Sequence, residues 1–153
     1  MEKFDSKYLQ MARIWATNSH AVRNKVGALI VKDGMIISDG YNGTPSGFDN
    51  CCEIEERTWD LDSEGDYSEY VHLVTKPEVL HAEANAITKV AKSTNSSEGS
   101  TLYVTLSPCL ECAKLIIQSG IKRVVYFEEY RNTAGIELLK KAGIEIEQIK
   151  DLD

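Results

Sequence analysis

Two apolar runs separated by Asp33-Gly34 constrain the fold of this chain more than any other feature. They lie in VGALIVKDGMIISDG (26–40), where Val, Ile and Leu flank the dipeptide. Asp-Gly between such runs is the strongest short-range signal of a β-hairpin, so strands are predicted near 26–32 and 35–41. The sheet is therefore expected to begin with two antiparallel strands.

Helices and strands alternate along the rest of the chain. Helices are predicted over 3–18, 81–93, 108–119 and around 134–142, and strands over 101–106, 122–128 and 144–149. Pro108 suits a first helical turn, and Gly120 ends the same helix. This order predicts an α/β protein, a three-layer α/β/α sandwich around a mixed five-stranded sheet.

Length and charge narrow the classes of protein to consider. The 153 residues suit a single domain, 1–153, with one core. A formal net charge of −7 repels a phosphate backbone, which disfavours a nucleic acid partner. No segment resembles a signal peptide or a membrane span, so we expect a cytoplasmic protein with no membrane partner. Four cysteines in that compartment favour metal ligands or free thiols over disulfides.

An acidic insertion at about 44–79 interrupts the pattern of elements. Nine acidic residues between Asp49 and Glu69 accompany a single basic residue, Arg57. Charge runs are usually solvated, partly disordered loops. A connection of this length inside a compact domain is, however, often functional or separately stabilised. The sequence leaves both interpretations open.

A C-x-x-C pair formed by Cys109 and Cys112 lies at the start of a predicted helix. Zinc usually takes at least three protein ligands, and His81, at the start of another predicted helix, is the best third candidate. Two thiolates and one imidazole leave one position for water, which is typical of a catalytic zinc. The alternatives are a redox dithiol and a structural zinc with a fourth protein ligand.

Glu83 favours the catalytic interpretation. It follows His81 by two residues, so its carboxylate is expected to reach a water at the zinc without binding the metal. H-x-E followed by P-C-x-x-C is the signature of zinc-dependent nucleobase deaminases, and here Cys109 lies 26 positions after Glu83. In that chemistry hydroxide attacks C4 of cytosine or C6 of adenine, and Glu83 acts first as base and then as acid so that ammonia leaves.

From about residue 11 to residue 149 the chain resembles the deoxycytidylate (dCMP) deaminases of the cytidine deaminase-like superfamily, especially those of phages. The resemblance lies in VGALIV, GYNGTPSG, HAEANAI and TLYVTLSPCLECAKLIIQSGIKRVVY. It implies the deaminase α/β/α sandwich, zinc-dependent hydrolysis of dCMP to dUMP for thymidylate synthesis, and a homo-oligomer, often a hexamer. A phage-encoded enzyme of this kind would act in the host cytoplasm.

The resemblance also points to residues that contact the substrate. Asn42 matches an asparagine that contacts the sugar hydroxyl, although Asn-Gly is also an ordinary turn dipeptide. Ser107 is expected at the pyrimidine edge, and Tyr126 at the base. For the 5′-phosphate the candidates are Arg23, Lys25, Arg131 and the backbone of GTPSG (43–47).

Regulation is a further implication of the resemblance. Many dCMP deaminases are activated by dCTP and inhibited by dTTP, with Mg²⁺ on the triphosphate. The effector is then expected near Asn24, Lys25, Asn42 and Gly43.

Some phage-type relatives hold a second, structural zinc in the insertion. The residues left to bind it here are His20, Cys51, His72 and Glu78. Such a zinc would order the insertion, because metal binding contributes folding free energy. The alternative is that these are loop thiols and surface histidines.

Other activities stay open at this point. A deaminase acting on dCTP would carry the same motifs. A tRNA adenosine deaminase shares them too, but it would need a basic surface. Free cytidine deaminases usually have a third cysteine where this chain has histidine. A non-catalytic zinc module would have a closed coordination sphere and would release no ammonia.

Overall fold

The hairpin at Asp33-Gly34 and the alternating elements are present in the computed structural model, which describes residues 1–152. Asp33 and Gly34 have φ of 51° and 76°, the positive values that a two-residue type I′ turn requires. The elements, in chain order, are α1 (Asp5–Ala16), β1 (Gly27–Lys32), β2 (Met35–Tyr41), β3 (Glu53–Leu61), β4 (Tyr67–Thr75), α2 (Ala82–Ala91), β5 (Thr101–Leu106), α3 (Leu110–Gln118), β6 (Arg123–Glu128), α4 (Ala134–Lys141) and β7 (Glu145–Gln148).

Five strands form the central sheet in the order β2-β1-β5-β6-β7. β1 pairs antiparallel with β2 and β5, whereas β5, β6 and β7 run parallel to one another. Parallel neighbours need crossover connections, and α3 and α4 supply them. The predicted mixed five-stranded sheet is confirmed.

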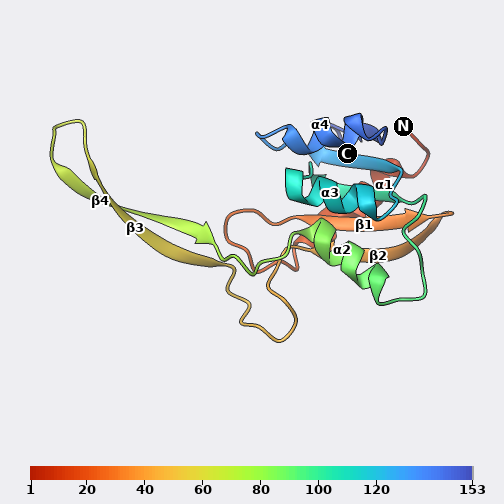
Figure 1. Cartoon of the computed structure of the whole chain (residues 1–153), viewed down its shortest axis with the longest axis horizontal. Coiled ribbons are helices and arrows are strands. Elements are labelled where there is room, and N and C mark those ends of the chain that lie inside the picture. Colours follow the sequence, from red (N-terminus) through yellow and green to blue (C-terminus); the bar gives the residue numbers. More distant parts are fainter. Residues whose placement is uncertain (153) are drawn as a thin grey trace.

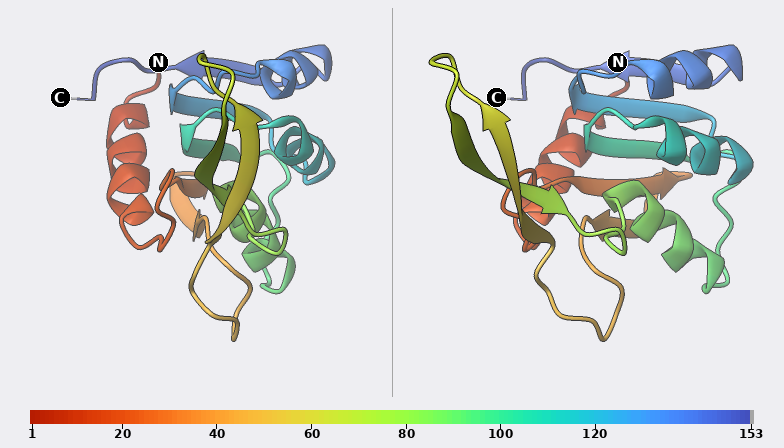
Figure 2. Two further views of the ribbon diagram at one scale, coloured as in Figure 1. Left: turned by 90° about the vertical axis from the view of Figure 1, so that its left-hand side faces the viewer. Right: turned by 60° about the vertical axis from the view of Figure 1, so that its left-hand side comes forward.

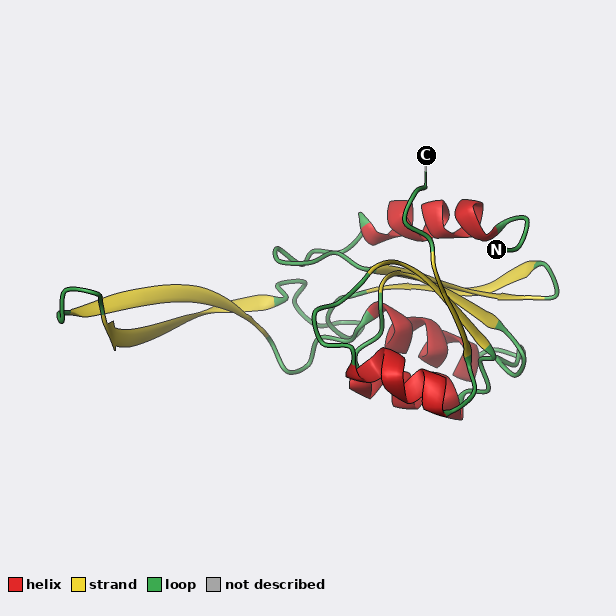
Figure 3. Cartoon of the chain, turned by 90° about the horizontal axis from the view of Figure 1, so that it is seen from above, coloured by secondary structure: helices red, strands yellow, loops and turns green. Residues whose placement is uncertain are grey.

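Helices cover both faces of this sheet (Figure 3). On one face α2, α3 and α4 enclose a core that includes Ile30, Leu102, Val104, Ile116 and Leu139. On the other face α1 alone packs on the sheet and forms a second, smaller core. There Leu9 of α1 packs in a cluster that includes Leu29, Tyr103 and Val125 of the strands. The two cores confirm the three-layer sandwich. None of the described helices is long and apolar enough to cross a membrane.

A buried ion pair fastens α1 to the sheet. Arg123 on β6 has a side chain 2% exposed and donates two hydrogen bonds to the Asp5 carboxylate, at 2.8 and 2.6 Å. The Tyr103 hydroxyl donates a third to Asp5, at 2.7 Å, and Glu147 accepts another from Arg123. Burial opposes ionisation of Asp5, but the hydrogen bonds from Arg123 and Tyr103 outweigh it and lower its pKa to about 2.

The acidic insertion contains a β-hairpin, which we call the arm (residues 53–75). β3 and β4 pair antiparallel as a separate two-stranded sheet. Figure 1 shows the arm reaching away from the layers, and Figure 2 shows it from two further sides. A loop through these residues, the usual structure for a charge run, is therefore wrong. Between the acidic residues the arm holds Thr, Trp, Tyr and Val, which favour strands.

Candidate active site

Two helix N-termini meet at one edge of the sheet and carry the predicted metal ligands. His81 immediately precedes α2, and Cys109 immediately precedes α3. Both have extended backbones, with ψ of 158° and 172°. The segment before His81 is fixed to the end of β2, since Gly43 and Leu80 exchange backbone hydrogen bonds of 3.0 and 2.8 Å. The segment before Cys109 follows β5, which ends at Leu106, and the Ser107 N–H donates to the Glu128 carbonyl at 2.9 Å.

Two glycines let these helices approach their neighbours closely. A Cβ atom at Gly40 on β2 would collide with the carbonyl oxygen of Ala82, the first residue of α2. A Cβ at Gly135 on α4 would collide with the backbone of Pro108 and Cys109. Any larger residue would push a ligand-bearing segment away. Neither position stands out in the sequence, since a lone glycine in a strand or helix does not indicate which segment approaches it.

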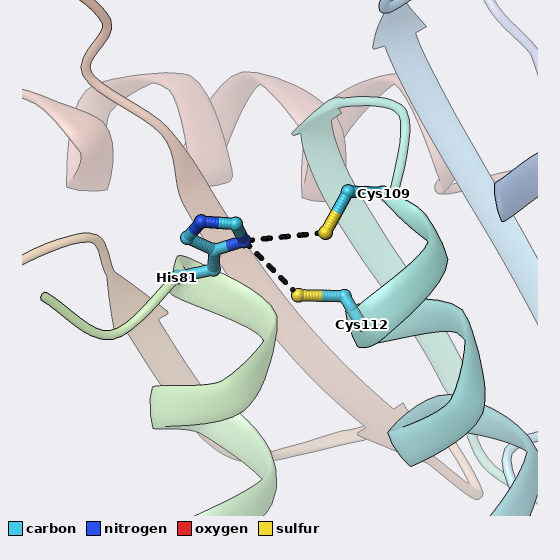
Figure 4. A group of neighbouring side chains, drawn as sticks. All are labelled: His81, Cys109 and Cys112. Carbon is cyan, nitrogen blue, oxygen red and sulfur yellow. Dashed lines mark hydrogen bonds between the residues drawn. The ribbon is translucent and has the colours of Figure 1, made fainter. Parts of the chain in front are cut away.

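His81, Cys109 and Cys112 point toward one another (Figure 4). The Nδ1 atom of His81 lies 3.3 Å from Cys112 Sγ and 3.4 Å from Cys109 Sγ. The three ligand atoms all lie within 4.8 Å of one another. One imidazole nitrogen and two sulfurs are donors that zinc prefers, and three protein ligands are the number typical of a catalytic site. The residues therefore fit a zinc ion.

One of the two cysteines is already a thiolate, while the hydrogen bond to Cys109 and burial raise the pKa of the Cys112 thiol. Hydrogen bonds from Cys112 and His81 lower the pKa of Cys109 to about 3, which keeps it a thiolate. The hydrogen bond to Cys109 in turn raises the pKa of His81. A thiolate is the form of cysteine that binds metal. The Cys109 thiolate lies at the N-terminus of α3, where the helix dipole favours negative charge.

Glu83 lies in the first turn of α2, only 4% exposed. Burial raises the pKa of its carboxyl group to about 7. A carboxyl group that both takes up and releases a proton near neutral pH suits general acid-base chemistry. Its position two residues after His81, in the first turn of the helix, is the one that the H-x-E spacing predicts.

A pocket of about 220 Å³ opens beside the metal ligands. His81, Glu83 and Cys109 line one side of it. The other lining residues come from the segment before β1, the segment after β2, the two ends of the arm, the segment at the start of α2 and the segments at the ends of β5 and β6. They are Ala21, Arg23, Asn24, Val26, Asn42, Cys52, Glu53, Thr75, Val79, Ala82, Leu106, Ser107 and Tyr130.

Asn42 and Ser107 lie in this pocket, where the sequence places them. The Asn42 amide also holds its surroundings: Oδ1 accepts from Val26 N–H at 2.9 Å, and Nδ2 donates to the Asn24 carbonyl at 2.8 Å. Asn42 is thus a turn residue and a pocket residue at once. The Ser107 hydroxyl accepts a hydrogen bond of 2.7 Å from the backbone N–H of Tyr130.

Tyr126, which the resemblance places at the base, does not line the pocket. It lies on β6, is 6% exposed and packs in the core beneath α2, α3 and α4. Tyr130, four residues later and beyond the strand, lines the pocket instead. The strand of β6 ends at Glu128, and the chain turns toward the pocket only after it. No local signal in the sequence distinguishes the two tyrosines.

Sequence reasoning also missed the part of the pocket wall that the arm supplies. Cys52, Glu53 and Thr75 stand at its root and line the pocket. Glu53 is 7% exposed, and its Oε1 accepts hydrogen bonds from the backbone N–H groups of Val22 at 2.9 Å and Arg23 at 3.3 Å. The root of the arm is thereby fixed to the segment before β1.

The predicted effector residues lie at different places. Asn24 lines the active-site pocket and also a neighbouring cavity of about 200 Å³, which Lys25 and Arg13 line as well. Gly43 lines neither cavity and instead pairs with Leu80. Of the phosphate candidates, Arg23 lines the active-site pocket, whereas Lys25 and Arg131 do not.

The structure does not bring the four candidate ligands of a second zinc together. Among residues 1–152, only His81, Cys109 and Cys112 form a group able to hold a metal. His72 lies in mid-arm opposite Glu56, and the Cys51 thiol donates to the Glu53 carbonyl at 3.1 Å. His20 and Glu78 lie outside the arm, before β1 and before α2.

Comparisons with known proteins agree with this site. Residues 2–128 match the family model described as the cytidine and deoxycytidylate deaminase zinc-binding region. The deoxycytidylate deaminase of enterobacteria phage T4 is 42% identical, over 92% of this chain and 87% of the phage protein. That of phage T2 is 39% identical, over 97% and 93%.

A solved structure is similar over the whole fold. It is the dCMP deaminase of cyanophage S-TIM5 in complex with dCMP and dUMP, with a TM-score of 0.83 and 43% identity. The match covers 97% of this chain and 99% of the cyanophage chain. The chain belongs to the cytidine and deoxycytidylate deaminase family.

Proposed function

We propose that this family member is a zinc-dependent hydrolase that converts dCMP into dUMP and ammonia, and so supplies dUMP for thymidylate synthesis. One observation carries the proposal: a buried Glu83 carboxylate and a His81–Cys109–Cys112 metal site open on the same pocket. The choice of dCMP is supported by the phage T4 and T2 relatives and by the cyanophage enzyme that binds dCMP and dUMP.

The chain's own residues divide the chemistry between them. His81, Cys109 and Cys112 would hold the zinc. Bound zinc lowers the pKa of a water from about 15.7 to roughly 7, which makes hydroxide available near neutral pH. Glu83 takes a proton from the water and delivers it to N3 of cytosine while oxygen bonds to C4. Glu83 then takes the second proton from the hydroxyl on C4 and passes it to the amino group, so that the C4–N bond breaks, the C4 carbonyl of uracil forms, and ammonia leaves.

Substitution of Glu83 tests this assignment. Glu83→Gln removes the proton carrier but keeps the size of the side chain, so ammonia release from dCMP should fall by about 10²- to 10⁴-fold while zinc content is unchanged. Glu111→Gln is the matched control, since Glu111 stands inside the C-x-x-C motif but is exposed and paired with Lys114. Near-normal turnover in Glu83→Gln would refute the proposal.

Arg23 is our candidate for the 5′-phosphate, because it is the one lysine or arginine among the described residues that line the pocket. A charged hydrogen bond contributes about 1.5–3 kcal/mol. Arg23→Gln should therefore raise KM for dCMP about 10- to 100-fold and leave deoxycytidine, which has no phosphate, nearly unaffected. Lys25→Gln, which alters the neighbouring cavity, is the control. An equal loss with both substrates would place the phosphate elsewhere.

The substrate alternatives separate in one assay. Ammonia release is measured in parallel from dCMP, dCTP, deoxycytidine and cytidine, and dCMP should be the best substrate. Faster release from dCTP would make this a dCTP deaminase. A tRNA adenosine deaminase is disfavoured by the negative charge of the chain. A non-catalytic zinc module would release ammonia from none of the four.

Allosteric control by dCTP as activator and dTTP as inhibitor stays a prediction. It is supported by the cavity that Asn24, Lys25 and Arg13 line, because Asn24 faces the active-site pocket as well. Mg²⁺ would accompany the triphosphate. Steady-state rates against dCMP, with and without dCTP, test the proposal, and a hyperbolic curve unchanged by dCTP would refute it.

The second zinc, the hexamer and the cytoplasmic location also stay predictions. Metal analysis tests the second zinc of His20, Cys51, His72 and Glu78: two zinc ions per chain would support it and one would refute it. The mass of the assembly in solution tests the hexamer.

A further inference from the structure

Beyond its root, the arm packs against no other described helix or strand of its own chain. In the described part, residues 1–152, neither β3 nor β4 contacts any other helix or strand. Figure 1 shows the hairpin standing clear of the layers. A single two-stranded hairpin is marginally stable in water, because it can bury little apolar surface. The arm therefore needs a further surface to pack against.

One face of the arm is built for such contact. Because directly opposed residues of a hairpin share a face and successive residues alternate, the odd-numbered residues of both strands lie on one side. Four large apolar side chains gather on the outer half of this side: Trp59, Leu61, Tyr67 and Val71, exposed by 62%, 59%, 72% and 52%. We call it the odd face. The opposite face holds mostly polar residues, among them Glu56, Thr58, Asp60, Ser68 and His72.

The charge of the arm narrows the choice of partner. The arm carries eight of the 24 acidic residues but only one of the 17 basic residues, Arg57. The remainder of the chain has sixteen of each, so the whole formal charge of −7 belongs to the arm. Most of these acidic residues lie at the tip of the arm and on its opposite face: Glu56, Asp60, Asp62, Glu64 and Asp66. A surface that fits the apolar odd face should therefore offer apolar side chains with positive charge at its edge, where it meets the acidic tip.

The chain itself presents such a surface on α1. Positions that share the outward side of this helix carry Phe4, Met11, Ile14 and Trp15, exposed by 53%, 45%, 69% and 38%. Lys3 and Lys7 lie on the same side, and no carboxylate of the described residues forms an ion pair with either. We call this side the α1 outer face.

We propose that the odd face of the arm packs on the α1 outer face of a second copy of this chain. The arm makes no contact with its own α1, so the interaction joins two molecules. Since the two surfaces lie on different parts of the chain, the contacts close either as a reciprocal pair or as a ring. Both arrangements cover every arm and every α1 outer face.

Docking of the arm also bears on the active site. The root of the arm lines the pocket through Cys52, Glu53 and Thr75. A partner copy that holds the outer half of the arm therefore steadies the pocket wall at its base. Assembly and substrate binding are coupled in this way, although the contact itself is independent of the proposed reaction.

The mass of the protein in solution tests the contact. Analytical ultracentrifugation of the unaltered chain should show an oligomer, and the double variant Trp59→Ser, Tyr67→Ser should sediment as a monomer. The control is Ile54→Ser, Tyr70→Ser, which removes two similarly exposed apolar residues from the opposite face and should keep the oligomer. Zinc content and circular dichroism confirm that each variant is folded. A monomeric unaltered chain, or an oligomer that survives the odd-face variant, overturns the proposal.

A cross-linking experiment on the unaltered fold identifies the partner surface. A photoreactive benzoyl-phenylalanine replaces Trp59, and the labelled chain is mixed with ¹⁵N-labelled unaltered protein. Mass spectrometry should find peptides from residues 3–15 of the ¹⁵N chain attached at position 59. Attachment to another element, or to the photoreactive chain's own peptides, overturns the assignment to α1. Neither readout depends on turnover, so failure here is distinct from failure of the proposed activity.

Discussion

Apolar residues and a central ion pair are buried in the layered body, whereas apolar residues and ion pairs are exposed in the arm. In the body, apolar side chains lie between the sheet and its helices, and the central ion pair of Asp5 and Arg123 is almost fully buried. In the arm, Trp59, Leu61 and Tyr67 face solvent, and the ion pair of Arg57 and Glu69 is exposed. Acidic and basic residues balance outside the arm, and only within it do acidic residues dominate.

This difference shows what stabilises each region. The body buries its own apolar surface and depends on internal packing. The arm buries little, so its order depends on the root contacts of Glu53 and on whatever covers its odd face. It also shows that a net charge averaged over a chain describes no particular surface. The active-site pocket lies where the two regions meet, and both contribute to its lining.

The largest effect on stability should come from the buried ion pair of the body. Asp5→Asn removes the one fully buried carboxylate among the described partners of the Arg123 guanidinium, which should lower the free energy of unfolding by about 3 kcal/mol. The counterpart in the arm, Arg57→Gln, removes an exposed pair and should cost less than about 1 kcal/mol. Urea denaturation of the two variants measures both values. Equal losses would contradict the contrast between body and arm.

The lowered pKa of Asp5 should make the free energy of unfolding depend on pH in acid. The ordinary pKa of an aspartate is 3.8, and in the folded protein that of Asp5 is about 2. Because the folded value is the lower one, this stabilisation is fully present above about pH 4 and is lost as the pH falls toward 2, a change of about 2 kcal/mol. Unfolding measured at pH 5 and at pH 2.5 should show a smaller acid loss in Asp5→Asn than in the unaltered chain. Parallel curves for the two would contradict it.

The next effect concerns the junction of body and arm. Glu53 positions Arg23 by accepting its backbone N–H, and the Arg23 guanidinium also donates to the Leu73 carbonyl of the arm, at 3.3 Å. Glu53→Ala should therefore raise KM for dCMP about tenfold, or about 1.4 kcal/mol, with a smaller change in kcat. Glu53→Gln keeps an acceptor oxygen and should restore much of the affinity.

Glu56→Ala provides the control for this junction. Glu56 is an exposed acidic residue of the same strand but lies away from the pocket lining. Its removal should leave KM unchanged. An equal rise of KM in Glu56→Ala would mean that the charge of the arm, and not the hydrogen bonds of Glu53, controls substrate binding.

The sequence predicts the body well because its signals are local. The turn at Asp33-Gly34, the alternating apolar residues and the helix starts at His81 and Cys109 each depend on a few neighbouring residues. The pocket does not depend on neighbouring residues alone, since Glu53, Thr75 and Tyr130 come together only through the tertiary fold. For the same reason Tyr126 was expected in the pocket but lies in the core.

The arm was missed for a different physical reason. Its acidic residues alternate with strand-forming residues, and a charge run is usually read as a solvated loop. Cross-strand pairs such as Leu61 with Tyr67 and Thr58 with Tyr70 give the hairpin its register. Asp62 closes its turn by accepting hydrogen bonds from the backbone N–H groups of Glu64 and Asp66, at 2.9 and 3.0 Å. An Asx-type turn of this kind is a signal that the sequence does contain.

The smallest effect should come from the charges that guide the arm onto its partner. Lys7→Glu places a negative charge on the α1 outer face, opposite the acidic arm, and should weaken self-association about two- to fivefold, since exposed ion pairs contribute up to about 1 kcal/mol. The difference in association between this variant and the unaltered chain should shrink in 0.5 M salt, because exposed charges then interact over less than about 8 Å. Lys140→Glu makes the same charge change on α4 and should leave association unchanged, because the arm does not dock there. Sedimentation of the three proteins at both salt concentrations measures these differences. If the two lysine variants weaken association equally, the arm responds to overall charge and not to a surface on α1.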